Sequence, residues 1–149
     1  MTVKVKQIPT KGGAVSPLPQ YQSEFSAGAD LTAAIDEAVT IAPHSRVLIP
    51  TGIAIEPSDN GIGAFIFARS GLASKHGICL ANSVGVVDAD YRGEIKVALL
   101  NTSDTSYTVQ PFERIAQLVI MPVIQAQFML SDTISDTERG AGGFGSTGK

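Results

Sequence analysis

The most reactive side chains lie in a few short polar stretches, and the densest chemistry is found at 82–94, "NSVGVVDADYRGE". This stretch brings together the amide of Asn82, the carboxylates of Asp88 and Asp90, and the phenol of Tyr91. A carboxylate that reaches a water molecule can act as a general base, so the stretch is a candidate for hydrolytic chemistry. Taken alone, the two aspartates are better explained as exposed turn carboxylates between strands.

A second stretch, "ARSGLASKHG" (68–77), is suited to binding phosphate. It offers the guanidinium of Arg69, the hydroxyl of Ser70 and the backbone N–H groups beside Gly71, against which a phosphate oxygen can lie. His76 follows a lysine, and we expect it to be a surface residue rather than a base.

Two further stretches each place a polar side chain among small or apolar residues. "AGADL" (27–31) contains the carboxylate of Asp30, and "ERIAQL" (113–118) contains Arg114 and Gln117. An arginine in an otherwise apolar run is expected to be an ion-pair partner of a carboxylate elsewhere in the fold.

The C-terminal stretch "RGAGGFGSTGK" (139–149) resembles part of a phosphate loop, because Gly143, Gly148 and Lys149 satisfy the pattern G-x-x-x-x-G-K. No Ser or Thr and no helix follow the lysine, so a true loop of that kind is not expected. Arg139 is a fork-shaped donor suited to phosphate, and Phe144 is a lone ring among glycines, which favours a stacking role. The alternative is a tail without a task.

Composition favours one globular domain with many turns. The chain has 149 residues, 44% of them hydrophobic and 17% charged, with 15 glycines and 8 prolines. From about Ser131 the polar, glycine-rich composition cannot offset the entropy of ordering, so we expect a folded domain at 1–130 and a mobile tail at 131–149.

Charge and cysteine content narrow the class of protein. A net charge of -3 gives no general attraction to nucleic acid, so we expect no nucleic-acid partner. The chain shows neither a signal peptide nor a membrane span, which predicts a cytoplasmic protein that does not bind membranes. Cys79 is the single cysteine, so we expect no intramolecular disulfide and interpret it as a buried apolar thiol.

The elements that must position these side chains are predicted to be strands. Short apolar runs, several of them alternating with period two, are separated by Gly, Pro, Asn and Asp. The runs are "VKVKQI", "VTIAP", "RVLIPTGIAIE", "GAFIFA", "GICLA", "GEIKVALLN", "RIAQLVIMPV" and "QAQFML". We therefore predict an all-β fold, either a sandwich, a jelly roll or a small barrel. The one helical turn predicted is capped by Ser70 and ends at Gly77.

Taken together, these stretches resemble the trimeric deoxyuridine triphosphatase (dUTPase) family. Five motifs of that family occur here in order, and they extend from 27 to 148: "AGADL", "ARSGLASKHGI", "GVVDADYRGE", "ERIAQLVI" and "RGAGGFGSTG". No departure within them removes a functional side chain. The resemblance implies a jelly-roll-like β-barrel of the dUTPase type with a flexible C-terminal tail, assembled as a homotrimer with shared active sites.

The resemblance also implies an activity. The family hydrolyses dUTP to dUMP and pyrophosphate, which keeps uracil out of DNA and supplies dUMP for thymidylate synthesis. Asp88 matches the catalytic carboxylate that activates water for attack at the α-phosphorus, whereas Asp90 has no implied role. Mg²⁺ would arrive with the triphosphate and its waters, with no direct protein ligand and Asp30 at most in its outer shell.

The substrate contacts implied by the resemblance fall into four sets. They comprise the phosphate contacts Arg69, Ser70, Gly71 and Gln117, the uracil contacts Asn82, Gly85 and Val86, the sugar contact Tyr91, and the lid residues Arg139, Phe144, Gly145 and Ser146. In this scheme the lid crosses to a site built mainly by neighbouring subunits.

Three alternatives stay open at this point. A dCTP deaminase shares the fold but needs a glutamate in the strand "EIKVALLN", which carries no carboxylate after Glu94. A non-catalytic dUTP-binding or signalling protein could keep the same pocket, although an intact Asp88 favours catalysis. An all-β structural module with a disordered tail would bind no nucleotide.

Overall fold

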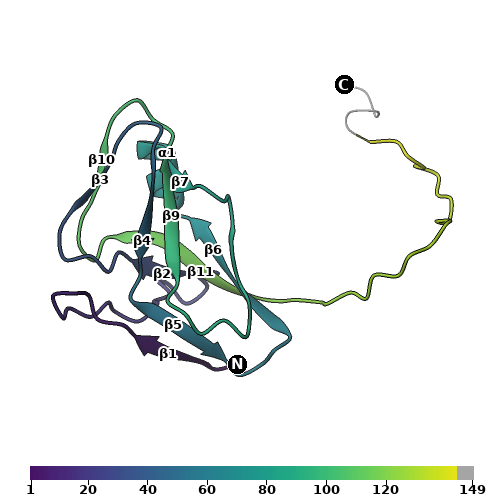
Figure 1. The fold of residues 1–149 in the computed structure, drawn as a ribbon, viewed down its shortest axis with the longest axis horizontal. Coiled ribbons are helices and arrows are strands. Elements are labelled where there is room, and N and C mark those ends of the chain that lie inside the picture. The colour runs from purple at the N-terminus through teal and green to yellow at the C-terminus, as the bar shows by residue number, and fades with distance from the viewer. Residues whose placement is uncertain (144–149) are drawn as a thin grey trace.

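The alternating runs of the sequence form short strands that pair antiparallel (Figure 1). The computed structural model describes residues 1–143. In chain order the elements are β1 (Val3–Gln7), β2 (Ala29–Thr32), β3 (Val39–Ile41), β4 (Arg46–Pro50), β5 (Ile53–Pro57), β6 (Ile62–Ala68), α1 (Ser70–His76), β7 (Ile78–Leu80), β8 (Gly85–Val87), β9 (Lys96–Asn101), β10 (Tyr107–Val109) and β11 (Arg114–Pro122). The all-β prediction is confirmed.

Two sheets carry most of the strands. One has the order β2-β11-β6-β8 and the other has the order β4-β9-β7, while β1 pairs with β5 and β10 pairs with β3. β11 lies between β2 and β6, and its register with β2 shifts between Arg114 and Ala116. All four predicted internal site stretches therefore contribute to the first sheet, because β2, the end of β6, β8 and β11 belong to it.

The core lies between the sheets, and in β9 it is built from alternating positions. In β9, Val97 and Leu99 are buried while Lys96 is exposed, as the period of two predicts. Ile41 and Val109, which come from the small β3–β10 pair, are also fully buried. Burial of each such side chain contributes about 1.5–3 kcal/mol, so packing between the sheets stabilises the scaffold that carries the polar stretches.

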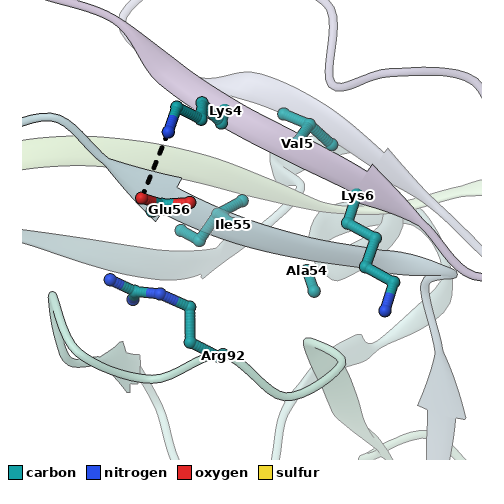
Figure 2. Close-up of a pocket in the computed structure, with 7 residues that line it drawn as sticks. All are labelled: Lys4, Val5, Lys6, Ala54, Ile55, Glu56 and Arg92. Atoms are coloured by element: carbon teal, nitrogen blue, oxygen red, sulfur yellow. Dashed lines mark hydrogen bonds and ion pairs between the residues drawn. The ribbon is translucent and has the colours of Figure 1, made fainter.

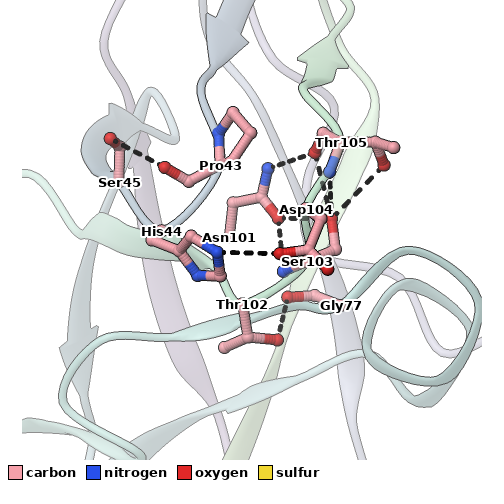
Figure 3. Close-up of polar contacts among 9 residues, drawn as sticks. All are labelled: Pro43, His44, Ser45, Gly77, Asn101, Thr102, Ser103, Asp104 and Thr105. Atoms are coloured by element: carbon pink, nitrogen blue, oxygen red, sulfur yellow. Dashed lines mark hydrogen bonds and ion pairs between the residues drawn. The ribbon is translucent and has the colours of Figure 1, made fainter.

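One fully buried polar side chain, Asn101, fixes the loop after β9 (Figure 3). Its amide nitrogen donates to the carbonyls of Ile41 at 3.1 Å and Thr105 at 2.7 Å. Its amide oxygen accepts from the backbone N–H of Ser103 at 2.9 Å and from the hydroxyl of the same residue at 2.8 Å. Since every polar atom of the amide has a partner, its burial costs little.

Three strands escaped the sequence prediction, and one predicted run is divided. β2, β8 and β10 are short and contain small or polar residues. The run "RVLIPTGIAIE" forms two strands, β4 and β5, because the chain turns at Thr51 and Gly52, where Gly52 has φ of +68°. A left-handed backbone of this kind favours glycine.

The predicted cap of α1 is wrong at one end and confirmed at the other. α1 begins at Ser70 itself, and its N-cap is Arg69, which has extended backbone and makes no side-chain capping bond. Gly77 closes the helix in the left-handed conformation, with φ of +68°. Cys79 is half-buried rather than buried. Within residues 1–143, no helix is long and apolar enough to cross a membrane.

The predicted strand "QAQFML" (125–130) is also wrong. After β11 the described chain extends away from the sheets without a strand or helix (Figure 1). The large apolar side chains of this exposed arm, defined as residues 124–134, are almost fully exposed. They are Ile124, Phe128, Met129, Leu130 and Ile134, which are 81–101% exposed. These apolar side chains are not covered by any surface of the chain's own domain.

Candidate active site

The stretch 82–94 forms one side of a cavity of about 390 Å³, a size that suits a small ligand. β8 holds this wall in place by pairing with β6, with Gly85 opposite Ile66 and Val87 opposite Ala64. The lining residues are Leu48, Ile66, Asn82, Gly85, Val86, Val87, Asp88, Tyr91, Glu94, Ile95 and Lys96. Five predicted site residues are therefore brought together: Asn82, Gly85, Val86, Asp88 and Tyr91.

A tight turn before β8 presents the amide of Asn82. The N–H of Ser83 donates to the carbonyl of Leu80 at 3.1 Å, and the N–H of Val84 donates to the carbonyl of Asn82 at 2.7 Å. Ser83 adopts φ of +62°, an uncommon conformation for a residue other than glycine. The Asn82 side chain is exposed and makes no hydrogen bond within residues 1–143, so both its donor and its acceptor are available to a ligand.

A second turn presents the carboxylate of Asp88 to solvent. The N–H of Tyr91 donates to the carbonyl of Asp88 at 3.1 Å and closes the turn. Nη1 of Arg92 donates to the carbonyl of Ala89 at 2.7 Å, which braces the same turn from outside. An exposed carboxylate at the edge of a cavity is placed to accept a proton from a bound water molecule.

The phenol of Tyr91 forms part of the cavity wall and is held at its hydroxyl. That hydroxyl donates to the carbonyl of Glu94 at 3.1 Å, although the residue is 46% exposed. The Glu94 side chain is fixed in turn, because Oε1 accepts from the N–H of Gly52 at 2.9 Å. The ring is thus attached, through one residue, to the turn between β4 and β5.

The second group of predicted residues centres on the buried carboxylate of Asp30. Its Oδ1 accepts from Nε of Arg69 at 3.2 Å, and its Oδ2 accepts from Nη1 of Arg114 at 3.1 Å. Nη1 of Arg69 also donates to the carbonyl of Arg114 at 3.0 Å. The predicted ion pair of Arg114 is confirmed, and one carboxylate orients two guanidinium groups whose remaining N–H donors can bind an anion.

The start of α1 lies beside this carboxylate and leaves its first N–H groups free. The first backbone bond of the helix runs from the N–H of Ala73 to the carbonyl of Arg69, at 3.0 Å. Ser70 and Gly71 are exposed, and a Cβ added to Gly71 would meet nothing within 4 Å. Packing of the chain therefore does not require glycine at this position, whereas close approach of a ligand would.

Gln117 lies on β11 opposite Asp30, and its side chain runs along Gly28. A Cβ added to Gly28 would lie 3.1 Å from Cβ of Gln117, so the small residue makes room for the amide. Arg69, Ser70, Gly71 and Gln117 do not line the cavity that contains Asn82 and Asp88. One chain therefore displays two separate groups of predicted site residues.

Of the four predicted lid residues, Arg139 alone lies within the described part of the chain. Arg139 belongs to the tail that follows β11, and its Nε donates to the carbonyl of Gly142 at 2.7 Å. That tail leads away from the sheets that carry both groups (Figure 1). Phe144, Gly145 and Ser146 lie outside the described residues. Asp90 is exposed in the turn after β8, and nothing in the structure assigns it a role.

The arrangement of possible metal ligands can be compared with the predicted binding of Mg²⁺. Among residues 1–143, no group of three or more His, Cys, Asp or Glu side chains is placed to hold a metal ion. Both oxygens of Asp30 accept from arginines, and its side chain is 3% exposed. This geometry favours a role for Asp30 in holding the arginines, and an outer-shell role toward Mg²⁺ stays a prediction.

A neighbouring hollow of about 360 Å³ lies over β1 and β5 and contains none of the predicted site residues (Figure 2). Lys4 pairs with Glu56 at 3.3 Å across the two strands, and both side chains are largely exposed. Arg92 reaches the hollow from the loop that also carries Asp88. Exposed pairs of this kind contribute little to stability, and the one carboxylate that lines the hollow, Glu56, is already paired with Lys4.

Some lining residues were beyond sequence reasoning. Leu48 and Lys96 come from β4 and β9, and Ile95 precedes β9. Leu48 is 59% exposed, a signal that only the folded chain provides. Leu48 and Ile95 give the cavity an apolar side beside its polar one, which suits a planar ring with a polar edge, and Lys96 adds a positive charge.

Comparison with known proteins gives a family for the whole chain. The dUTPase family model matches residues 14–148. The chain is 51% identical over 147 residues to the deoxyuridine 5'-triphosphate nucleotidohydrolase of Desulfitobacterium hafniense (strain DSM 10664 / DCB-2). It is 50% identical to the enzyme of the same name from Aeromonas salmonicida (strain A449). Each alignment covers 99% of this chain and 97% of the relative.

Solved structures of phage dUTPases have the same fold. The dUTPase of Staphylococcus bacteriophage 80alpha with dUpNHpp superposes with a TM-score of 0.85 and 28% identity, over 99% of each chain. The dUTPase from phage phi11 of S. aureus superposes with a TM-score of 0.79 and 20% identity, over 92% of this chain and all of that one.

Proposed function

This chain belongs to the dUTPase family and hydrolyses dUTP, and we propose that it uses Asp88 as the general base in forming dUMP and pyrophosphate. The observation that carries the proposal is the cavity in which the exposed carboxylate of Asp88 shares a wall with the exposed amide of Asn82. One residue can accept a proton there while the other reads a base.

The proposed reaction is an in-line displacement at the α-phosphorus. Asp88 orients a water molecule and accepts its proton as the water oxygen bonds to phosphorus. The bond between the α-phosphorus and the bridging oxygen to the β-phosphate breaks, and pyrophosphate leaves with the electron pair. Positioning and charge stabilisation supply most of the acceleration in this class of reaction, so the residues around the phosphates matter as much as the base.

The phosphates are assigned to the group around Asp30. Arg69 is held by that buried carboxylate and keeps donors free for phosphate oxygens. The hydroxyl of Ser70 and the free N–H groups at Ser70 and Gly71 add uncharged donors, and the amide of Gln117 adds one from β11. The open space above Gly71 supports close approach of a phosphate to the main chain.

Mg²⁺ fits this scheme as a partner of the substrate. The described residues supply no set of ligands for it, so phosphate oxygens and water would hold the ion. When bound, Mg²⁺ would neutralise part of the triphosphate charge and fix one of its conformers. The arginines held by Asp30 would neutralise the remaining charge.

Base selection is assigned to the β8 wall. The amide of Asn82 and the main chain at Gly85 and Val86 would pair with the polar edge of uracil, and cytosine would mispair with them at about 1–3 kcal/mol for each buried group. The methyl of thymine would collide with the hairpin backbone. Tyr91 would lie against the deoxyribose and leave no room for a 2′-hydroxyl.

The separation of the two groups supports a homotrimer with shared sites. The residues assigned to the phosphates do not line the cavity that contains Asn82 and Asp88 in the same chain. The corresponding residues of a neighbouring copy would therefore complete the site. The exposed arm supports the same conclusion, because its apolar side chains need a surface that their own domain does not offer. The tail at 131–149 is proposed to act as a lid, with Arg139 contacting the phosphates and Phe144, Gly145 and Ser146 covering the nucleotide.

A pyrophosphate-release assay tests the proposed function. The full chain is incubated with dUTP, UTP, dTTP or dCTP, with Mg²⁺ or with a chelator. We expect turnover of dUTP, and we expect the chelator to lower it. Equal rates for all four nucleotides would contradict the assigned base selection, and ammonia from dCTP would indicate deamination instead.

A further inference from the structure

Gly93 lies in the short segment between Tyr91 and Glu94, which both line the cavity, and it faces the ring of Tyr91. A Cβ added to Gly93 would lie 2.5 Å from Cζ of Tyr91 and closer still to its hydroxyl, well inside the roughly 3.5–4.0 Å of normal carbon contacts. The phenol rests against the bare main chain at Gly93 and would be displaced by any side chain there. The residue does not have positive φ, so its backbone conformation alone does not demand glycine.

The displaced atoms belong to the end of one side chain. The three atoms nearest to the added Cβ are all from the Tyr91 side chain, and none is from the main chain. Alanine at Gly93 would therefore move the phenol while the loop stays as it is. The same movement would break the bond from the Tyr91 hydroxyl to the carbonyl of Glu94, which measures 3.1 Å.

The position of this ring matters because of its neighbours in the cavity. Tyr91 lines the same wall as Asn82 and Asp88. Given the proposed function, the base lies at Asn82 and the α-phosphate at Asp88, so the sugar that joins them must pass Tyr91. The fit of the sugar is then set by how closely the ring lies against the chain.

We propose that Gly93 is a specificity-determining residue, which admits the Tyr91 ring to the one position that accepts deoxyribose and excludes ribose. The inference rests on the proposed function of the cavity. Gly93 acts through Tyr91, and the carbonyl of Glu94 holds the ring in the position that Gly93 makes available. Glu94 in turn is anchored to Gly52 on the β4–β5 turn.

The test compares kcat and KM for dUTP and UTP in the full chain and in Gly93→Ala. A displaced ring loses its fit to deoxyribose without gaining one for ribose. We therefore expect the ratio of kcat/KM for dUTP over UTP to fall roughly 10- to 100-fold, mainly through a higher KM for dUTP. Gly61→Ala, at an exposed glycine outside the cavity, is the matched control and should keep the ratio of the unaltered chain.

A double-mutant cycle separates this role from a general effect on folding. Because Gly93 acts through the ring, Gly93→Ala should have no further effect in a chain that already carries Tyr91→Ala. Calorimetric titration with the α,β-imido analogues of dUTP and UTP gives the same comparison where turnover is too slow to measure. An unchanged selectivity in Gly93→Ala, or an equal loss in the Tyr91→Ala background, would overturn the inference.

Tyr91→Phe keeps the inference testable if Gly93→Ala does not fold. This variant retains the ring but loses the bond to Glu94, so reduced selectivity supports the inference and unchanged selectivity contradicts it. Measurements on the unaltered chain distinguish failure of the proposed function from failure of the proposed role of Gly93. Without dUTP turnover in that chain the proposed function fails, whereas turnover with an unaltered Gly93→Ala ratio refutes the role of Gly93 alone.

Discussion

Asp30 and Arg69 form an ion pair in which the carboxylate is almost fully buried and lies 3.2 Å from Nε of the arginine. Because Arg114 binds the other oxygen, Asp30 holds two guanidinium groups toward the proposed phosphate site. If the phosphates bind there as proposed, the carboxylate links stability of the β2–β11 pair to substrate binding.

Replacing Asp30 by Asn should weaken both properties. The amide nitrogen cannot accept a hydrogen bond, so one arginine loses its partner, and we expect a loss of about 1–3 kcal/mol in the free energy of unfolding. KM for dUTP should rise as well, because Arg69 is no longer oriented. Urea unfolding and steady-state kinetics measure the two effects.

Glu56→Gln provides the control for that experiment. It removes the exposed pair with Lys4, and the expected cost is at most about 1 kcal/mol. If Asp30→Asn is no less stable than Glu56→Gln and binds dUTP normally, the assigned role of Asp30 is wrong.

Asp88→Asn should lower kcat by about 10²- to 10⁴-fold while the affinity for a non-hydrolysable dUTP analogue is retained, because a general base acts on the water rather than on binding. Pyrophosphate release and calorimetric titration separate the two quantities. Asp90→Asn, in the same exposed turn, is the matched control and should turn over at a rate close to that of the unaltered chain. An equal loss of kcat in Asp88→Asn and Asp90→Asn would contradict the assignment of Asp88 as the general base.

Charge in the exposed arm should prevent assembly. Phe128 and Leu130 are 95% and 101% exposed in the single chain, so Phe128→Asp with Leu130→Asp should not unfold the domain. We expect light scattering to show a lower mass and dUTP turnover to fall with it. Ser131→Asp adds charge to the same segment at a polar position and should assemble normally. A double variant that keeps its full mass would show that the arm plays no part in assembly.

Ending the chain after Glu138 should abolish turnover of dUTP without unfolding the domain. The removed residues include Arg139 and the rest of the proposed lid, and the described part of the tail makes no contact with the sheets in Figure 1. Circular dichroism checks that the strands persist, and the pyrophosphate assay checks activity. Full activity in the truncated chain would refute the lid.

Tyr107 should make stability depend on alkaline pH. Burial, together with the hydrogen bond to Glu113 and its charge, raises the pKa of Tyr107 from 10.0 to about 12. Stability from this group is complete below pH 10, where both states hold the proton, and it is lost as pH rises toward 12. Urea unfolding across that interval should show a smaller loss in Tyr107→Phe than in the unaltered chain. Parallel losses would show that another group titrates.

Strand prediction succeeded where side chains alternate and failed where packing decides. β9 follows its run of alternating residues, whereas β2 is buried throughout and β8 is a short edge strand that relies on β6. Alternation with period two is a property of half-exposed strands, so the sequence carried no such pattern for β2 or β8. The wrong strand at 125–130 has the apolar composition of a strand but no pairing partner on its own domain.

The candidate site could be predicted where its residues are close together in the sequence, and it could not where they are far apart in the sequence. Asn82, Asp88 and Tyr91 lie within one short stretch, and the chain folds them onto one cavity wall. The partner of Arg114 lies 84 residues away, and the contact of Glu94 with Gly52 spans 42 residues. Such pairs depend on strand register, which one sequence does not display.

In the proposed homotrimer, the direction in which the chain leaves β11 would set a condition on when catalysis can begin. In the proposed homotrimer, a newly made copy with half a site and an exposed apolar arm would be inactive until it meets other copies. The rate of hydrolysis would then rise more steeply than in proportion to the concentration of the chain, and dilution would abolish it. Nucleotide hydrolysis would be controlled by the encounter of copies as much as by the supply of nucleotide.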